Sequence, residues 1–401
     1  MLNSYQIPPK LYGDKSAGNK TVSGIEDLSS TRKSCSGTSG NNYVTVSAGD
    51  EASYSAGDQV LIHQSRGSNA DQTTTPNWEF NEVTSTSSGQ INLLNNLSQS
   101  YVDSGASQAQ IIKCPMWNTV TLPNGATIAP SAWDGNISGI EVIIADVFDG
   151  QSGGTINLNN LGFRAGQGTS TRSLTGEQGE GTAGAGGTRS TAANGSGAGG
   201  GQYGTAGDPW ASSGGGGGHA TAGDNGFNSG DHSRSSPGTG GVLKGNAGLT
   251  IIVLGGGGAA GGTHGDGGGG SPSSGAGGKG AAILIIFARS FTNLATINLG
   301  GVNGQNIQGS PPNAVDGAGG GGSGGASLIC GNIVDIGTNL ITAPGGTGGT
   351  TGSSNGGNGS AGRTHVEYGT SLTGSTNNPT ADTEQNNALK VFSPLPSHFQ
   401  V

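Results

Sequence analysis

Charged and aromatic side chains are scarce in this chain. Only 10% of its 401 residues are Asp, Glu, Lys or Arg, and 5% are Phe, Trp or Tyr. The formal net charge is −9, and the basic residues are scattered, with no run longer than Arg32-Lys33. A nucleic-acid surface needs clustered Lys and Arg, so this composition argues against one. Large apolar residues are also too few for a conventional side-chain core along the whole chain.

Long apolar segments are missing as well. The chain opens with MLNSYQIPPK, which lacks the apolar stretch of a secretory signal. Its longest apolar runs, IIVL and AAILIIFA, are too short to cross a bilayer. We therefore expect neither a secretory signal nor membrane insertion.

Cysteine is nearly absent too, with Cys35, Cys114 and Cys330 as the three examples. Their spacing fits no metal motif, and an odd number leaves at least one thiol unpaired. A Cys35–Cys114 disulfide is compatible with the sequence. Cys330 lies in ASLICGNIV and is interpreted as a small buried apolar residue.

Glycine is what the chain has in excess, at 84 of 401 residues. It is most concentrated between two aliphatic runs, in LTIIVLGGGGAAGGTHGDGGGGSPSSGAGGKGAAILIIFA. A flexible linker needs no such flanking sequence. Polyproline II-type helices, in contrast, can pack side by side where Cβ atoms are absent, and aliphatic strands at their ends would nucleate that packing. We interpret the glycine as an ordered polyglycine lattice, seeded by strands at 139–147, 249–254, 281–289 and 326–335.

The chain divides by composition into four parts. Residues 1–30 are polar and predict an extended arm. Residues 31–135 hold short alternating or β-branched runs, typical of a small β-barrel or sandwich. Residues 136–375 are the glycine-rich part, and 376–401 form a C-terminal tail.

The glycine-rich part contains an internal repeat. Copies of a strand–turn–strand unit begin at Gly139, Gly280 and Gly325, with a weaker copy at Gly362. The tetrapeptide TINL recurs at 155–158 and 296–299. Spacings near 40 residues are typical of repeat architectures whose units cover one another's apolar faces. The predicted fold is therefore all-β: an N-terminal barrel or sandwich, then a β-solenoid-like repeat region with a packed polyglycine II bundle.

Glycine abundance also creates catalytic motifs by chance. Residues 321–325 match G-x-S-x-G and several stretches match G-x-G-x-x-G, but none has the strand–turn–helix context that gives these motifs meaning. We find no carboxylate pair or nucleophile–base arrangement, so we assign no catalytic residue and no cofactor. Several His and Asp residues in the glycine-rich segments have no spacing of a known metal site, and we interpret them as solvated loop residues: His219, Asp224, Asp231, His232, His264 and Asp266.

Large side chains within the longest glycine-rich insert are the strongest candidates for a binding site. They are separated by glycine and turn residues: Tyr203, Trp210, Phe227, His232 and Arg234. Aromatic and Arg side chains on rigid loops suit a recognition surface, because they bury a large area at small entropic cost. The alternative is that they fill gaps in a thin lattice. Trp78, Trp117 and Trp133 flank predicted strands, and we expect them in the core.

This alternation of glycine-rich motifs with short aromatic segments resembles the tip adhesins of T-even-like phage long tail fibres, over roughly residues 165–280 and extending toward 370. The resemblance implies polyglycine II sandwiches whose distal loops bind host outer-membrane proteins or surface glycans. The strand repeats at 280–345 and the 135-residue N-terminal part depart from that pattern. The repeats are also similar to glycine-rich β-solenoid segments of bacterial surface proteins.

The sequence therefore predicts a non-enzymatic virion surface protein, a tail-fibre or tail-tip adhesin attached through residues 1–135. Expected partners are a host surface protein or glycan and other virion tail or capsid proteins, with homo-oligomerisation left open. No nucleic acid is expected. The alternatives are a subunit of an extracellular filament or capsid decoration, located outside the cell or on its surface, and a β-solenoid polysaccharide depolymerase.

Overall fold

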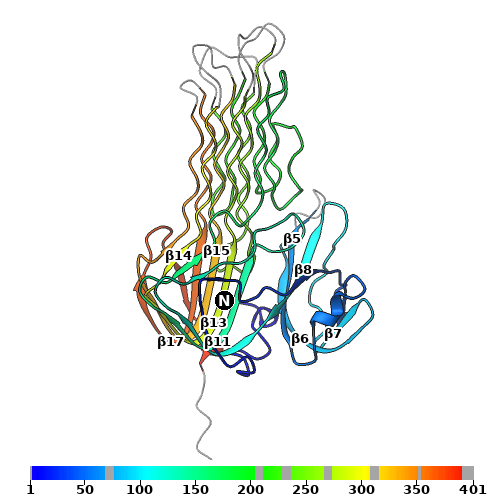
Figure 1. Ribbon diagram of the computed structural model, residues 1–401, viewed down its shortest axis with the longest axis vertical. Helices are drawn as coiled ribbons and strands as arrows, with labels where there is room; N and C mark the ends of the chain where they lie inside the picture. The colour runs from blue at the N-terminus through cyan, green and yellow to red at the C-terminus, as the bar shows by residue number, and fades with distance from the viewer. Residues whose placement is uncertain are drawn as a thin grey trace, which may run out of the picture.

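Within the part of the chain that it describes, the computed structural model is built of β-strands, short 3₁₀ turns and extended glycine-rich segments (Figure 1). The described residues are 2–67, 76–203, 211–227, 236–265, 273–307, 316–350 and 354–390. The 3₁₀ turns are η1 (Ser4–Gln6), η2 (Asp50–Ser53) and η4 (Asn387–Leu389). No helix in these ranges has the length and apolar character needed to cross a membrane. The fold is all-β, as the sequence predicts.

The largest sheet is parallel throughout. Among the described residues its seven strands lie in the order β1-β9-β11-β13-β15-β17-β18. Their bounds are β1 (Asn19–Thr21), β9 (Met116–Leu122), β11 (Ile140–Gly150), β13 (Ile283–Asn293), β15 (Ala326–Thr338), β17 (Arg363–Ser375) and β18 (Asp382–Gln385). We call this sheet A.

A second parallel sheet, sheet B, faces sheet A across an apolar core. Its described strands lie in the order β16-β14-β12-β10-β2. Their bounds are β2 (Ile25–Glu26), β10 (Thr127–Ile128), β12 (Thr155–Asn157), β14 (Thr296–Asn298) and β16 (Ile341–Thr342). Strands β9, β11, β13 and β15 of sheet A are each followed by a short strand of sheet B, so each pair forms one rung and the rungs stack as in a β-solenoid.

The repeats detected in the sequence coincide with these rungs. The two TINL copies pair in register, Thr155 with Thr296 and Ile156 with Ile297. In sheet A, strands β11, β13, β15 and β17 lie next to one another, and the register of β15 with β17 shifts between Gly331 and Ile333 and again between Asp335 and Thr338. Equivalent positions of successive rungs lie above one another, and similar side chains form buried columns between the two sheets. One example is the pair Phe148 and Phe291, whose rings stack with centroids 5.0 Å apart.

An antiparallel sheet formed by residues 32–114 packs against the other face of sheet A. Its described strand order is β3-β8-β5-β6-β7-β4. The bounds are β3 (Arg32–Ser34), β4 (Tyr43–Thr45), β5 (Gln59–Arg66), β6 (Trp78–Ser87), β7 (Gln90–Leu93) and β8 (Gln108–Cys114). A bridge between Ser36 and Thr45 links the two ends of this order. At the interface with sheet A, the Phe80 and Phe287 rings meet edge to face with centroids 5.6 Å apart.

Strands of the two parallel sheets lie in both regions where the sequence predicts an extended arm (1–30) and a C-terminal tail (376–401). Residues 2–30 supply β1 and β2, and the side chain of Leu2 is buried. At the other end, β18 extends sheet A beside β17. These terminal strands have polar side chains, but an open sheet edge exposes unpaired N–H and C=O groups. A polar strand can pair with those groups through its backbone. The parallel rungs therefore begin before residue 136.

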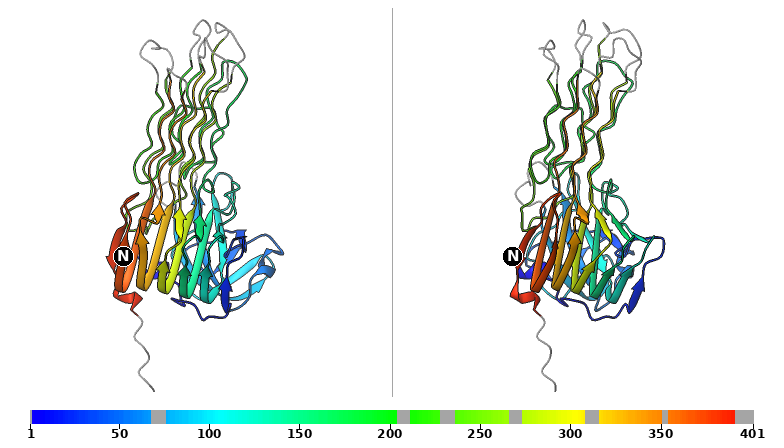
Figure 2. Two further views of the ribbon diagram at one scale, coloured as in Figure 1. Left: turned by 60° about the vertical axis from the view of Figure 1, so that its left-hand side comes forward. Right: turned by 90° about the vertical axis from the view of Figure 1, so that its left-hand side faces the viewer.

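Between rungs the chain makes long excursions rich in glycine. They leave the short strands of sheet B, run side by side away from the sheets and return into the next long strand of sheet A (Figures 1 and 2). We call the described parts of 162–281, 300–325 and 343–362 the glycine-rich bundle. Because each excursion is fixed at both ends to adjacent rungs, the solenoid sets where neighbouring bundle segments lie.

The bundle is held by backbone hydrogen bonds that repeat every third residue. The N–H groups of Gly255, Gly258 and Gly261 donate to the carbonyls of Ala281, Gly278 and Gly275, at 2.8–3.0 Å. The N–H groups of Gly257, Ala260 and Thr263 donate to the carbonyls of a second segment, at Glu180, Glu177 and Leu174. The N–H groups of Ala259 and Gly262 donate to the carbonyls of a third segment, at Gly215 and Ser212. Successive residues thus bond to different neighbours. A β-strand, in contrast, alternates between two sides.

Close backbone approach makes glycine necessary in this bundle. A Cβ placed on Gly320 would lie 1.8 Å from the carbonyl oxygen of Gly215, and one on Gly258 would lie 2.2 Å from that of Gly320. Such contacts are far inside van der Waals distance. Ala259 and Ala260, which do carry a Cβ, are fully buried between the segments. The glycine-rich part of the bundle therefore has a packed interior although its segments carry few large side chains.

Candidate functional site

Two of the five predicted recognition residues, Tyr203 and Phe227, lie within the described parts of the glycine-rich bundle. Phe227 is 57% exposed, and Tyr203 is partly buried. Trp210, His232 and Arg234 lie outside the described residues. The recognition role of all five stays a prediction.

The backbone of Phe227 is fixed although its ring is exposed. Its N–H donates to the carbonyl of Asn355 at 2.8 Å, and its own carbonyl accepts from the Ser354 hydroxyl at 3.0 Å. The Ser354 carbonyl in turn accepts from Ser213 Oγ at 2.9 Å. Three segments of the bundle therefore hold the position of one outward-facing aromatic side chain.

A polar cluster centred on the buried residues His264 and Asp316 lies within the bundle. Asp316 Oδ1 accepts from the His264 backbone N–H at 2.8 Å and contacts His264 Nδ1 at 2.6 Å, and Asp316 Oδ2 accepts from the Ser273 N–H at 2.5 Å. Arg172 Nη1 lies 2.8 Å from His264 Nε2. With Nδ1–H donated to Asp316, Nε2 accepts from Arg172, so the cluster cross-links segments of the bundle.

The other histidine and aspartate candidates from the sequence are not brought together. His219 is buried and contacts the Val253 carbonyl at 3.2 Å; burial, reinforced by Arg363, lowers its pKa to about 3. Asp224 is exposed and accepts from Asn358 Nδ2 at 3.0 Å. Neither shares a partner with His264. Two of these histidines are thus buried, not solvated as predicted, while Asp231, His232 and Asp266 lie outside the described residues.

Among the described residues, a His–carboxylate group that sequence reasoning missed lies at the edge of sheet A. His365 and Glu367 on β17 and Glu384 on β18 place one ligand-type atom each within 4.8 Å of one another. The available signal was the spacing in THVEY and DTE, because residues two apart on a strand share a face.

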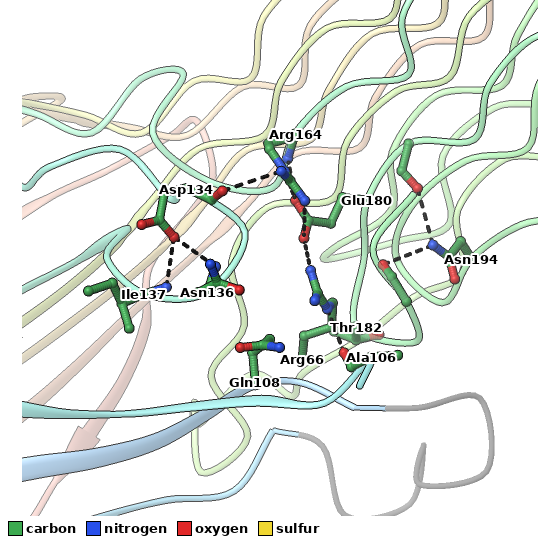
Figure 3. Close-up of polar contacts among 12 residues, drawn as sticks. Arg66, Ala106, Gln108, Asp134, Asn136, Ile137, Arg164, Glu180, Thr182 and Asn194 are labelled. Carbon is green, nitrogen blue, oxygen red and sulfur yellow. Dashed lines mark hydrogen bonds and ion pairs between the residues drawn. The ribbon is translucent and has the colours of Figure 1, made fainter. Parts of the chain in front are cut away.

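At its base, the bundle is joined to the antiparallel sheet through a buried carboxylate (Figure 3). Glu180 forms an ion pair with Arg66 at the end of β5 and another with Arg164, whose Nε lies 2.8 Å from Glu180 Oε2. The Gly67 N–H also donates to the Thr182 carbonyl at 2.8 Å. Neither Glu180 nor its partners stand out in the sequence, because the stretch GEQGEGTAGAGG carries a second, similar glutamate and the two arginines lie outside it.

A pocket of about 330 Å³ lies between the N-terminal residues and strand β6. Its lining includes Glu79 and Asn81, both of which are engaged within the protein. Glu79 accepts from the Ser98 N–H at 2.9 Å and from the Tyr101 hydroxyl at 2.9 Å. Asn81 donates to the Asn95 carbonyl at 2.9 Å. These bonds hold the loop around Ser98, and we assign the pocket no chemical role.

The cysteines do not form the disulfide that the sequence allowed. Cys35, Cys114 and Cys330 are all free and buried. Cys35 belongs to the core of the antiparallel sheet, whereas Cys114 faces sheet A, so the two thiols pack in different apolar clusters. Cys330 is fully buried, as predicted. Of the tryptophans, Trp78 and Trp133 are buried and Trp117 is partly buried against the core between the sheets.

No protein-family model and no curated protein matches this chain. Among solved structures, it has a weak likeness to the tailspike protein gp49 from Pseudomonas phage LKA1, with 10% sequence identity and a TM-score of 0.19. The match covers 87% of this chain and 42% of the tailspike, so the chain spans less than half the length of that protein. A TM-score this low supports no conclusion about fold or function.

Proposed function

We propose that the glycine-rich bundle consists of packed polyglycine II helices. A polyproline II-type helix has three residues per turn, so every third N–H points in the same direction. The hydrogen bonds from residues 255–263 fit this geometry, because each third donor reaches the same neighbouring segment. In this proposal the residues of β3–β8 form a small barrel, for which the Ser36–Thr45 bridge is the supporting contact.

We further propose that the protein is a virion surface adhesin, of the tail-fibre or tail-tip kind, that binds a host surface protein or glycan. One observation carries the proposal. A bundle locked by backbone hydrogen bonds extends away from the sheets (Figure 1), and the Phe227 side chain on one of its segments is exposed. The assignment to a virion depends on the sequence resemblance to glycine-rich phage tip adhesins.

A rigid bundle is physically suited to such a role. Binding through flexible loops loses free energy because the loops must be ordered, and pre-organisation reduces that loss. Here the backbone at Phe227 is already fixed by Asn355 and Ser354. In this proposal the antiparallel sheet attaches the protein to the particle, and the chain acts without catalysis or cofactor.

The test is binding of purified protein to host cells. We expect Tyr203→Ala, Phe227→Ala and Trp210→Ala, separately and combined, to weaken cell binding while the unfolding midpoint stays unchanged. Leu294→Ala is the matched control, because Leu294 is 54% exposed but follows β13, at the sheets. Unchanged binding by the triple variant would remove the recognition proposal.

An assembly role is the second candidate, and the open edges of sheet A favour it. Strands β1 and β18 occupy opposite edges of a parallel sheet, and both are largely exposed. An exposed edge is a template for pairing with another chain. Long fibres of purified protein in negative stain would support a filament or decoration subunit. Release of sugars from host polysaccharide would instead support the third alternative, a depolymerase.

A further inference from the structure

The last two strands of sheet A replace apolar side chains with ionisable ones. On the face that packs toward the antiparallel sheet, Leu328 and Cys330 of β15 lie beside His365 and Glu367 of β17. On β18, Asp382 pairs with His365, and Glu384 pairs with Glu367. Parallel register thus gathers one imidazole and three carboxylates on one face.

Two of these side chains, His365 and Glu367, are so deeply buried that the free-energy cost of removing them from water must be offset. The side chain of His365 is 1% exposed and that of Glu367 is 0% exposed. Burying ionisable groups is costly unless charge partners or a metal ion compensate. Glu367 is also fixed in place, since its Oε1 accepts from the Leu2 N–H at 2.8 Å and its Oε2 accepts from Asn386 Nδ2 at 2.6 Å.

The orientation of the imidazole is that of a metal ligand. His365 Nδ1 lies 2.9 Å from Asp382 Oδ2, a carboxylate placed to accept the Nδ1 proton. Metal-binding histidines characteristically donate their second nitrogen to such a carboxylate, which leaves the other nitrogen as a lone pair for the ion. Here that nitrogen, Nε2, faces Glu367 Oε1, which is also an electron-pair donor.

The distance between these two atoms suits a shared ion. His365 Nε2 and Glu367 Oε1 are 3.4 Å apart. Ligands at zinc bond lengths of ~2.1 Å, arranged as a tetrahedron, are separated by about 3.4 Å. Glu384 supplies a third donor within 4.8 Å of both. A tetrahedral site then has one further position, for water.

We propose that His365, Glu367 and Glu384 bind one divalent transition-metal ion, with Zn²⁺ as the preferred ion and Asp382 as the residue that orients His365. Mixed imidazole and carboxylate ligands suit Zn²⁺ better than Mg²⁺ or Ca²⁺, which prefer oxygen alone. The ion ties β18 to β17, and through Glu367 it also fixes the chain at Leu2. This site is independent of the receptor-binding proposal.

The test uses full-length protein without an affinity tag. We expect it to retain about one Zn²⁺ per chain after dialysis, and its melting temperature to rise with added Zn²⁺ but not with the same concentration of Mg²⁺. Substitution with Co²⁺ should give a visible spectrum without thiolate charge transfer, because the ligands are nitrogen and oxygen. A protein that retains no ion, and whose melting temperature ignores Zn²⁺, overturns the proposal.

Variants separate the metal site from adventitious binding. Glu384→Gln changes a partly exposed ligand and should abolish the Zn²⁺-dependent rise in melting temperature, measured relative to the variant's own metal-free value. Asp382→Asn should weaken affinity 10–100-fold. Glu177→Gln, a carboxylate in the bundle, is the matched control and should bind Zn²⁺ normally. If Glu384→Gln binds Zn²⁺ with unchanged affinity, Glu384 is not a ligand and the assignment is contradicted. The cluster is then a protonated His365 held between the carboxylates of Asp382 and Glu367.

Discussion

Arg66 and Glu180 form an ion pair that joins the antiparallel sheet to the glycine-rich bundle (Figure 3). Their side chains are 4% and 0% exposed, and Arg164 contacts the same carboxylate from the opposite side. Arg66 also donates from Nε to the Ala106 carbonyl at 2.6 Å. The orientation of the bundle on its base thus depends on a fully buried charge.

Breaking this pair should strongly destabilise the protein. Glu180→Gln keeps the shape of the side chain but leaves the Arg66 guanidinium buried without its counter-charge, which typically costs about 3–5 kcal/mol. The control is Glu177→Gln, whose Arg189 partner is 33% exposed and whose loss should cost about 0–1 kcal/mol. Urea unfolding of both variants measures the difference. Equal losses of unfolding free energy in the two variants would show that Glu180 does not stabilise the contact between the bundle and the antiparallel sheet.

The packing of the bundle gives a second prediction. Gly320→Ala places a Cβ against the Gly215 carbonyl, so we expect a loss of about 3 kcal/mol or more as the segments are forced apart. Gly187→Ala is the control, since its φ is +73° but nothing lies within 4 Å of the added Cβ. It should cost about 1 kcal/mol for the backbone conformation alone. Thermal unfolding separates the two, and a harmless Gly320→Ala would contradict close packing.

Amide exchange tests whether the bundle is ordered in solution. The N–H groups of Gly258, Gly261 and Gly320 donate to carbonyls of other segments and lie in the interior of the bundle. We expect them to exchange far more slowly than the same residues in a synthetic peptide of residues 255–262, because exchange requires the segments to separate. Peptide-like rates in the intact protein would mean that the glycine is a flexible linker.

The sequence predicted the repeat units that follow residue 136. The copies at Gly139, Gly280, Gly325 and Gly362 carry enough β-branched and aliphatic residues to be recognised, and the TINL pairs lie in register. The two rungs before residue 136 were missed. Strands β9 and β10 were grouped with the predicted N-terminal barrel or sandwich, whereas strand β1, NKT, and strand β2, IE, have no apolar pattern. Such strands are specified by the hydrogen-bonding edge of their neighbour, which a single sequence does not reveal.

The candidate sites, too, were only partly predictable from the sequence. Phe227 was identifiable because an aromatic residue among glycines is conspicuous, and its side chain is exposed. The partners of Glu180 and His365 were not identifiable. Arg66 is 114 residues from Glu180, and Asp382 is 17 residues from His365. Such contacts follow from the packing of the bundle and the register of the sheet.

Buried histidine gives a pH-dependent prediction. Burial lowers the pKa of His63 to about 4, although its hydrogen bond to the Ile252 carbonyl favours the charged form. The unfolded chain binds this proton below about pH 6.5 and the folded protein only below about pH 4. The contribution is therefore fully present above pH 6.5 and is lost as the pH falls toward 4, by about 3 kcal/mol. In His63→Gln, stability should fall less steeply over this range in urea unfolding.

Glu141 should produce the opposite dependence. It lies on β11 and is fully buried, and its Oε1 accepts from Ser29 Oγ at 3.0 Å. Burial, together with the negative charge of Asp27, raises its pKa to about 8, against the opposing effect of Arg32. Between about pH 4.5 and 8 the folded protein holds a proton that the unfolded chain has released. Stability from this group is thus present at low pH and declines as the pH rises.

Replacing Glu141 with glutamine removes this titration and keeps the size of the side chain. We expect Glu141→Gln to match the wild type near pH 5 and to exceed it in unfolding midpoint at pH 8, because only the wild type must then hold or release a buried proton. Urea unfolding at a series of pH values compares the two slopes. If the slopes are equal, the Glu141 carboxylate is already ionised at neutral pH, and the Arg32 guanidinium beside it outweighs the effect of burial.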